Sequence, residues 1–403
     1  MNPALVIPTY WAQDKNALKL EGMGVYDHAT ALAEPVSELE RCLSSLEQVR
    51  GVLRIFVLLV CEAEIEEAVR ARVNGICRMH AGLNICVVGS AEAKFVQAAV
   101  QELAPHLGVD MVSLRGYGAI RNMGLAVSAI FGHDVVVFLD DDEIVLDGDF
   151  LLNAVYGLGL MTRQGLPIVA KSGYYLNQEA SPYAPVHKLK LRNKYWSKWI
   201  EFNQWMHRAQ NAPRISRSNY VCGGCFALSA EAFSKVAFDP IITRGEDLDY
   251  LLNLRLKGMD VWFDNQWCVR HLPPPLPDTA ARFLQDVYRW EYEQAKLEAA
   301  NNSIGLSQVR TESLRPYPSE WLSPKLDKRI RYTALIRAIL GPERKAYLTI
   351  WRSSRKQAKA FAAANRKRYL QLATYWPRII ASMWDNDLLA QKILATGQIE
   401  DQS

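Results

Sequence analysis

The chain has 403 residues, of which 49% are hydrophobic, 22% charged and 10% aromatic, with a formal net charge of +4. This composition is typical of a globular protein with a substantial core, and it excludes disorder, collagen and coiled coil as descriptions of the whole chain. The length predicts two or three domains.

Cysteine content and hydropathy indicate the cellular setting. Seven cysteines in a chain of this length predict buried thiols in a reducing compartment. The apolar stretches, such as residues 53–61, are shorter than the roughly 18 residues that a bilayer requires. The N-terminus lacks the basic start of a secretory signal. We therefore expect a cytoplasmic protein without a membrane span.

Positive charge is concentrated near the C-terminus. Residues 325–368 carry fourteen Lys and Arg residues against Asp327 and Glu343, a surplus of twelve, so the rest of the chain has a net charge of −8. Such a surplus is typical of a solvated helical face or an oligomer contact, and it also favours an anionic partner. We expect either a homo-oligomer or peripheral contact with the inner face of a membrane, and no specific nucleic-acid partner.

Short apolar stretches alternate with helical patterns in the first third of the chain. The expected strands are residues 4–7, 53–60, 84–88 and 111–114, and the expected helices are residues 36–49, 62–78 and 91–103. Strands separated by helices indicate βαβ units and a parallel sheet covered on both faces. The pattern predicts an α/β domain.

A central strand is expected at residues 134–139, after a helix at residues 124–131. Asp140, Asp141, Asp142 and Glu143 follow this strand directly. Ligands of open α/β sheets bind beyond the carboxyl ends of the strands, so we expect these carboxylates at a binding site. Regular alternation is lost across residues 174–220, which are dense in aromatic and basic residues, and we interpret this stretch as an insertion around the site.

The domain continues to a run of prolines. The expected elements are a strand at residues 222–228, a helix capped by Ser229, a helix after residues 244–247 that ends at Gly258, and a strand at residues 261–263. The prolines at 273–275 continue neither a helix nor a sheet ladder. We therefore predict one domain over residues 1–277, with the insertion at 174–220.

A basic helical region is predicted over residues 278–403. Its expected helices are residues 279–300, 323–340, 343–376 and 379–395, with breaks at Pro342 and Pro377.

Acidic residues and one histidine predict a cation site. Asp140–Asp142 follow the central strand, Glu246 and Asp247 begin a later helix, and His271 precedes the prolines. Carboxylates with an imidazole suit Mg²⁺ or Mn²⁺ bound partly through a substrate diphosphate. Such a metal neutralises charge on a diphosphate leaving group, while Asp247 accepts a proton from an attacking hydroxyl. This chemistry is group transfer from a nucleotide-activated donor to an alcohol.

The same residues also have other interpretations. Glu246 and Asp247 could serve only to stabilise a helix N-terminus, and His271 could be a core histidine. The spacing of Cys222 and Cys225, together with Cys268 and His271, is also that of a structural zinc site.

Six motifs in order resemble the GT-A-fold glycosyltransferases, in particular family 2. They are Ile7-Pro-Thr-Tyr, the helix around Cys42-Leu-Ser-Ser-Leu, Ile120-Arg-Asn-Met-Gly-Leu, Val137-Phe-Leu-Asp-Asp-Asp, Gly223-Gly-Cys-Phe-Ala-Leu and Gly245-Glu-Asp-Leu-Asp, within residues 4–275. The fourth is similar to the DXD motif and the last to the acidic pair of that family. The resemblance implies a GT-A, Rossmann-like α/β domain. The C-terminal helical extension is predicted from the helical pattern and lacks an obvious counterpart in family 2.

The resemblance also implies roles for particular residues. The metal ligands would be Asp142, Asp140 and His271, and the catalytic pair would be Asp247, as base, and Glu246. Gly223 and Gly224 would admit the sugar or the acceptor. The residues in contact with the donor would be Pro8, Thr9, Tyr10, Glu62, Arg121, Asp140 and Asp141. Glu62 would take the place of an aspartate that many members of the family have.

The function predicted in this way is metal-dependent transfer of a sugar from a nucleotide-sugar donor to a hydroxyl of a glycan, a lipid-linked molecule or a small molecule, with inversion. Because sugars stack on aromatic rings, Trp196 and Trp199 are expected at the acceptor, with the alternative that the insertion packs on the helical region and its tryptophans belong to the core. Three alternatives stay open: a retaining GT-A transferase of similar layout, a sugar-phosphate nucleotidyltransferase, and a non-catalytic protein that binds polyanions through its basic region.

Overall fold

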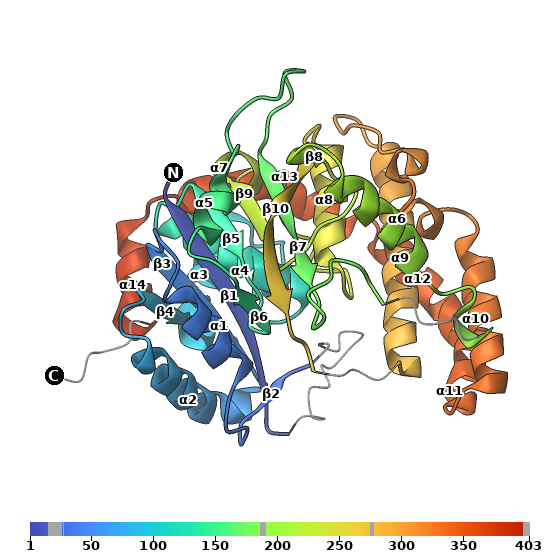
Figure 1. Cartoon of the computed structure of the whole chain (residues 1–403), viewed down its shortest axis with the longest axis horizontal. Coiled ribbons are helices and arrows are strands. Elements are labelled where there is room, and N and C mark those ends of the chain that lie inside the picture. Colours follow the sequence, from blue (N-terminus) through green and yellow to red (C-terminus); the bar gives the residue numbers. More distant parts are fainter. Residues whose placement is uncertain (15–25, 27, 186–190, 275–277, 398–403) are drawn as a thin grey trace.

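The computed structural model describes residues 1–14, 26, 28–185, 191–274 and 278–397. In this part of the chain the main strands form one ten-stranded sheet in the order β4-β3-β1-β5-β9-β7-β10-β6, with β2 beside β1 and β8 beside β10. Helices cover the sheet, and further helices from the C-terminal third gather at one side of it (Figure 1).

Four parallel strands form the first half of the sheet, as predicted from the alternating pattern. They are β1 (Pro3–Ala12), β3 (Arg54–Val60), β4 (Ile85–Val88) and β5 (Val135–Phe138). The short β2 (Thr30–Ala31) pairs with the end of β1. Nearly all their side chains are buried, because helices lie on both faces.

The helices between these strands also lie close to their predicted positions. They are α1 (Glu38–Leu46), α2 (Glu66–Met79), α3 (Ser90–Leu103) and α4 (Tyr117–Ile130). Helix α1 begins at Ser37, whose hydroxyl accepts a hydrogen bond from the amide of Glu40 at 3.1 Å. Its buried face is Leu39, Cys42, Leu43 and Leu46, which is the helical spacing seen in the sequence.

The strand predicted at residues 111–114 is absent, and that prediction was wrong. Residues Val109–Met111 form a 3₁₀ turn, and no described strand follows it before α4. Helix α4 supplies the hydrogen bonds that a strand neighbour would otherwise make. The Asn122 side chain donates to the carbonyl of Met111 at 3.0 Å, and the amide of Ser113 donates to the carbonyl of Ala119.

The second half of the sheet contains antiparallel pairs, which corrects the expectation of a parallel sheet. Strand β9 (Phe226–Ser229) lies antiparallel between β5 and β7 (Ala170–Leu176), and β6 (Glu143–Val145) is antiparallel to the end of β10 (Val261–His271). A strand buried on both faces is apolar whatever its direction, so the hydrophobic pattern alone does not fix the direction. The short helix α5 (Phe150–Val155) follows β6, and α7 (Ala230–Phe233) and α8 (Glu246–Leu256) follow β9.

Residues 174–220 contain more regular structure than predicted. Strand β7 extends to Leu176, α6 (Trp199–Gln210) packs on the sheet, and β8 (Ile215–Arg217) pairs with β10. Helix α6 buries Trp205, Met206 and Ala209 against Phe263 of β10. The apolar spacing of these three residues is difficult to recognise in the sequence, because polar and aromatic residues occupy the other side of α6.

The C-terminal region is helical, as predicted. It contains α9 (Ala280–Asn301), α10 (Leu326–Leu340), α11 (Arg344–Thr349), a π turn (Ile350–Ser354), α12 (Arg355–Asn365), α13 (Arg368–Met383) and α14 (Asp387–Gly397). None of the helices in the described ranges is both long and apolar enough to span a bilayer.

The predicted break at Pro377 is wrong, because Pro377 lies inside α13. The chain breaks instead at residues 366–367 and 384–386. At the second break the amides of Asp385 and Asn386 donate to the carbonyls of Ala129 and Ile130, the last residues of α4. These bonds satisfy helix-end carbonyls that have no partner within α4.

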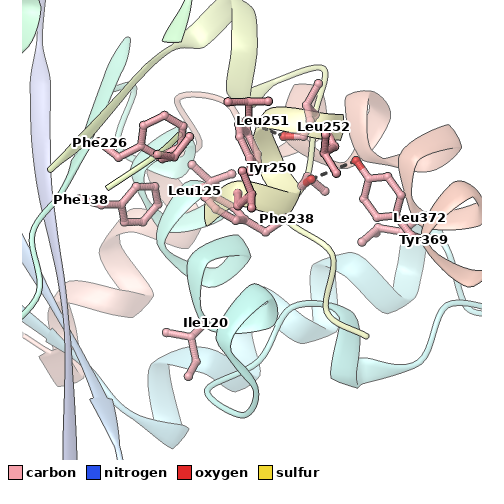
Figure 2. Packing of buried hydrophobic residues seen from close by; sticks show 14 of the residues in the cluster. Ile120, Leu125, Phe138, Phe226, Phe238, Tyr250, Leu251, Leu252, Tyr369 and Leu372 are labelled. Carbon is pink, nitrogen blue, oxygen red and sulfur yellow. Dashed lines mark hydrogen bonds between the residues drawn. The ribbon is translucent and has the colours of Figure 1, made fainter. Parts of the chain in front are cut away.

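The C-terminal helices share one hydrophobic core with the sheet. Helix α13 packs on α4 and α3, and α14 packs on α3 and β4. The Tyr369 hydroxyl donates to the carbonyl of Ala237, and the Trp376 indole donates to that of Phe233. Figure 2 shows part of the cluster, including Tyr369 and Leu372 of α13.

A buried ion pair adds a polar link between α9 and the sheet domain. Lys296 of α9 bonds to Asp239 at 2.9 Å and to Asp249 of α8, and all three side chains are almost fully buried. The boundary predicted near Pro277 falls outside the described residues, and the division into two domains stays a prediction.

Candidate active site

The described residues enclose a pocket of about 720 Å³ beyond the carboxyl ends of β1 and β5, where open α/β sheets bind ligands. One end is acidic and contains Asp140–Asp142 and His271. The other end lies against α6 and α9. The walls between them are formed mainly by Tyr10, Tyr26, Tyr117, Arg121, Tyr175, Gly223, Glu246, Asp247 and Tyr220.

Asp142 is the centre of the acidic end. Its Oδ2 atom lies 3.0 Å from Nε2 of His271 and 3.4 Å from Nε2 of His28. Burial opposes its ionisation, but the hydrogen bond and charge of His271 and the charge of His28 hold the pKa of Asp142 below its usual value. Asp142 is therefore an anion at neutral pH.

Asp141 is buried beside Asp142, and its environment differs. Burial and the charges of Glu38 and Asp142 raise the pKa of Asp141 well above its usual value. Its Oδ2 atom is buried and has no hydrogen-bond partner among the described residues. A cation at this position would offset the repulsion between the neighbouring carboxylates and would give the Oδ2 atom of Asp141 a partner.

Three residues of this end could bind a cation together. The ligand atoms of His28, Asp141 and Asp142 all lie within 4.8 Å of one another. Both ring nitrogens of His28 lack a hydrogen-bond partner among the described residues, although Nε2 lies 3.2 Å from Glu38. Carboxylate oxygens with an imidazole nitrogen fit Mn²⁺ or Mg²⁺.

This group differs from the ligand set predicted from the sequence. Asp140 is not part of it, because its Oδ1 atom lies 2.6 Å from Nη2 of Arg121. His271 adjoins it through Asp142. Sequence reasoning missed His28, since a lone histidine outside any motif or periodic pattern gives no signal.

Arg121 connects the two acidic motifs. Besides Asp140, its Nε atom contacts Oε1 of Glu246 at 3.4 Å, and its guanidinium lies 4.9 Å from the ring centroid of Phe138. Burial raises the pKa of Glu246 to about 7, although the charge of Arg121 acts in the opposite direction. The arginine therefore holds the DXD-like strand end and the start of α8 in one arrangement.

Asp247 faces the pocket across the glycine loop. Gly223 lies beneath it, and a β-carbon there would come within 3.3 Å of Nη2 of Arg121 and 3.5 Å of Oδ2 of Asp247. At Gly224 a β-carbon would overlap the carboxylate of Glu143. The glycine pair thus lets the loop pass close to the charged groups, with Gly223 in the pocket wall and Gly224 below it.

Tyr10 belongs to an aromatic wall. Its ring centroid lies 4.4 Å from that of Tyr26, which lies 5.2 Å from that of Tyr117. The Tyr26 hydroxyl accepts a hydrogen bond from the amide of Gly116 at 2.8 Å. Of the three, sequence reasoning singled out only Tyr10. The position of Tyr117 one helical turn before Arg121 was an available signal.

Four other predicted site residues do not line the described pocket. Pro8 and Thr9 are buried in β1, where Thr9 accepts a hydrogen bond from the indole of Trp11. Glu62 precedes the 3₁₀ turn before α2. Trp196 is partly buried and packs against the core residues Trp321 and Phe283, with ring centroids 4.7 and 4.8 Å away.

Trp199 does line the pocket, at its far end, and its side chain is 46% exposed.

The alternative zinc site is not assembled in the described part of the chain, where His28, Asp141 and Asp142 are the one group of ligand-type side chains close enough to share an ion. Cys222 and Cys225 are buried free thiols, and burial raises the pKa of each. His271 contacts Asp142 instead.

The mixed sheet, the pocket beyond β1 and β5 and its paired acidic motifs are the architecture of a GT-A glycosyltransferase. The chain matches the family model described as "Glycosyltransferase like family 2" over residues 54–292, which is more than half of its length. It therefore belongs to this family and is a glycosyltransferase, which confirms the predicted fold class and enzyme class.

Several solved structures are similar at low identity. A mannosyltransferase, PcManGT from Pyrobaculum calidifontis, in complex with GDP-Man and Mn²⁺ has 14% identity and a TM-score of 0.47, with 92% of this chain and 87% of that chain covered. GalNAc-T7 with UDP, GalNAc and Mn²⁺ has 12% identity and a TM-score of 0.42, with 82% and 57% covered.

Glucosyl-3-phosphoglycerate synthase from Mycobacterium tuberculosis, in complex with Mn²⁺ and uridine-diphosphate-glucose, has 16% identity and a TM-score of 0.35, with 68% and 72% covered. A comparison with curated proteins finds no significant match.

Proposed function

We propose that this protein transfers a sugar from a nucleotide-sugar donor to a hydroxyl of an acceptor, with the help of Mn²⁺ or Mg²⁺ and with inversion at the anomeric carbon. The observation that carries the proposal is the pocket itself. The buried acids Asp141 and Asp142 line it together with Asp247. Arg121 pairs with Asp140, the neighbour of Asp141, and with Glu246, the neighbour of Asp247.

The cation would be held by Asp142 with Asp141 and His28, and His271 would orient Asp142. Asp140, predicted as a further ligand, would reach the cation or the donor ribose only if Arg121 released it. When bound, the metal would neutralise charge on the departing nucleoside diphosphate. The unpartnered Oδ2 atom of Asp141 supports this assignment.

The donor would lie along the aromatic wall. Tyr10, Tyr26 and Tyr117 offer ring faces for the nucleobase, and Arg121 and Asp140 lie between that wall and Asp247. Pro8 and Thr9 would act by fixing the position of Tyr10, since both are buried behind it. Glu62 remains a candidate for contact with the base.

Asp247 would be the catalytic base. It would accept the proton of the acceptor hydroxyl as the oxygen attacks the anomeric carbon and the bond to the nucleoside diphosphate breaks. Glu246 would support it by fixing Arg121. A retaining outcome is the alternative, and the anomeric configuration of the product, measured by NMR, decides between them.

The acceptor would enter between Gly223 and Trp199. Gly223 leaves space beside Asp247, and the exposed ring of Trp199 offers a stacking face for a sugar. Trp196 and Gly224 would contribute by supporting Trp199 and Gly223.

The basic helices would contact a membrane surface. Exposed basic side chains follow one another along α11 to α13: Arg344, Lys345, Arg352, Lys356, Lys359, Arg366, Lys367 and Arg368. Clusters of this kind attract anionic lipids. Binding to vesicles with and without anionic lipid tests this proposal, and equal binding to both would contradict it.

The central test is a thermal-shift panel of nucleoside diphosphates and nucleotide sugars with and without Mn²⁺, because a ligand that binds the native state raises the melting temperature. We expect metal-dependent stabilisation by one nucleotide, followed by release of its diphosphate when an acceptor is added. Release of pyrophosphate from a nucleoside triphosphate and a sugar phosphate would instead identify a nucleotidyltransferase. No stabilisation by any nucleotide would contradict the proposal.

A further inference from the structure

Three basic side chains line the pocket where α6, α8 and α9 border it, and we call this part the basic end. Lys198 precedes α6, Arg244 precedes α8, and Arg289 lies on α9. Segments far apart in the sequence thus bring three positive charges to one region. Their common neighbour is Asp286 of α9, whose pKa is lowered by Arg244, Lys198 and Arg289 against the effect of burial.

Two of these three cations contact carboxylates on α9. Arg244 pairs with Asp286 at 3.2 Å. Arg289 approaches Glu293 at 3.6 Å, and burial raises the pKa of Glu293 to about 8. The charge of Asp247 also acts on Arg289 and on Lys198.

Lys198 has no ion-pair or hydrogen-bond partner among the residues that the structure describes. Its ammonium lies 5.4 Å from the ring centroid of Trp199. Burial lowers its pKa to about 8, although Asp286 acts in the opposite direction. Lys198 is partly exposed and lines the pocket, so an anion in the pocket can reach this ammonium.

The charges that act on Lys198 also place it near the base. They are those of Asp286, Arg289, Arg244 and Asp247. Asp247 acts on Arg289 as well. Asp140 pairs with Arg121, and Asp142 pairs with His271 and His28, so these ion pairs of the acidic end do not involve Lys198, Arg244 or Arg289.

We propose that Lys198, Arg244 and Arg289 form an anion subsite for the acceptor, so that the sugar is transferred to a hydroxyl compound that carries a carboxylate or phosphate. This inference rests on the proposed function and extends it. The anion would be bound by the three cations, which would present the hydroxyl to Asp247. Lys198 is a substrate-binding residue in this arrangement, and Arg244 and Asp286 hold the cluster together.

The subsite can be tested without turnover. Inorganic phosphate and malonate serve as probes, with sodium chloride at equal ionic strength as the reference, and thermal shift is the readout. We expect both probes to stabilise the wild-type protein, Lys198→Arg and Lys194→Gln, and not to stabilise Lys198→Gln. Lys194 is a matched control because it is exposed and lies outside the pocket.

Turnover then identifies the acceptor class. Glycerol, glycerate and glycerol 3-phosphate share one carbon skeleton and differ in charge, and vesicles of phosphatidylglycerol offer the same phosphate in a lipid. We expect a charged compound to exceed glycerol, and Lys198→Gln to raise its KM by about ten- to a hundredfold, the effect of losing a hydrogen bond to a charged group. Preference for the soluble compounds or for the vesicles identifies the source of the anion.

Three results would overturn the inference. They are no stabilisation of the wild-type protein by either probe, a preference for glycerol, and weaker binding of nucleoside diphosphate with Mn²⁺ in Lys198→Gln. The last would assign the cations to the donor. Failure of the proposed function has a different signature, namely stabilisation by phosphate or malonate without any stabilisation by nucleotides.

Discussion

The two ends of the pocket are built in different ways. The acidic end depends on consecutive residues, Asp140–Asp142, that follow one buried strand. The basic end depends on Lys198, Arg244 and Arg289, which come from three separate segments. A site built on one strand end can be recognised from a motif, whereas a site assembled from distant segments becomes apparent only in the folded chain.

The two ends also differ in their compensation of charge. In the acidic end Asp140 pairs with Arg121, and Asp142 pairs with His271. In the basic end Lys198 has no such partner among the described residues. We therefore expect changes at the acidic end to abolish the reaction, and changes at the basic end to alter the choice of acceptor.

The largest effect is expected for Asp142→Asn. It removes the carboxylate that both histidines contact, so transfer should fall by about a thousandfold or more, the loss that corresponds to several kcal/mol of transition-state stabilisation. Initial rates and Mn²⁺-dependent thermal shift measure it. Asp147→Asn is the control, because Asp147 is exposed five residues further along the chain. Undiminished turnover in Asp142→Asn would refute the assignment.

A somewhat smaller effect is expected for Asp247→Asn. Loss of a general base lowers kcat by about 10²- to 10⁴-fold. Because Asp247 is not in the candidate cation group, stabilisation by nucleoside diphosphate with Mn²⁺ should persist. A loss of donor binding equal to the loss of kcat would instead place Asp247 in the donor site.

A moderate effect is expected from pH at the basic end. Burial lowers the pKa of Lys198 from its usual 10.5 to about 8, so the folded protein loses this positive charge as the pH rises through about 8. Affinity for sulfate, whose charge is constant in this range, should then fall about tenfold per pH unit if the lysine must be protonated. Lys198→Arg should abolish this dependence, because arginine stays charged.

Over the same pH range, the contribution of Lys198 to the free energy of unfolding changes in the direction opposite to the affinity for sulfate. Below about pH 8 both the folded and the unfolded chain hold the proton on Lys198. Between about 8 and 10.5 the unfolded chain holds more of it, so this lysine's contribution to the free energy of unfolding rises with pH. Chemical denaturation with and without sulfate separates the two trends. Sulfate affinity that does not change with pH in the wild-type protein would exclude Lys198 from the subsite.

The smallest effect is expected for Trp199→Ala. An exposed stacking ring contributes about 0.5–1.5 kcal/mol, so the acceptor KM should rise about two- to tenfold with kcat nearly unchanged. Tyr195→Ala is the matched control, since Tyr195 is also exposed but contacts the ring of Tyr332 in a tilted arrangement outside the pocket. Equal effects of the two substitutions would indicate a general loss of packing.

Much of the acidic end could be predicted from the sequence. Asp140–Asp142, Arg121, Glu246, Asp247 and His271 all line the pocket, as expected from strand ends and helix starts. His28 and Tyr26 could not be predicted, because they lie in a stretch without periodicity. Trp196 was misleading, since an aromatic residue near a site can equally belong to the core.

Helices and strands with a strong hydrophobic periodicity could be predicted from the sequence. Strand direction and helix continuation, which depend on tertiary contacts, could not. The alternation in the first half of the chain predicted four of its five expected strands and the helices between them, but not the 3₁₀ turn at residues 109–111 or the start of α4 at Tyr117. The antiparallel direction of β9 and the continuation of α13 through Pro377 depend on contacts that no local pattern records. Pro377 was misjudged because proline usually breaks a helix.

The return of the last helix to the first half of the sheet has one further consequence. Strand β4 ends the sheet order in the described part of the chain, and α14 approaches it so closely that a β-carbon at Gly397 would come within 2.6 Å of the carbonyl of Val87. Exposed edge strands recruit other chains and promote aggregation. The final helix therefore covers part of the strand at which another chain could otherwise pair, as well as completing the core.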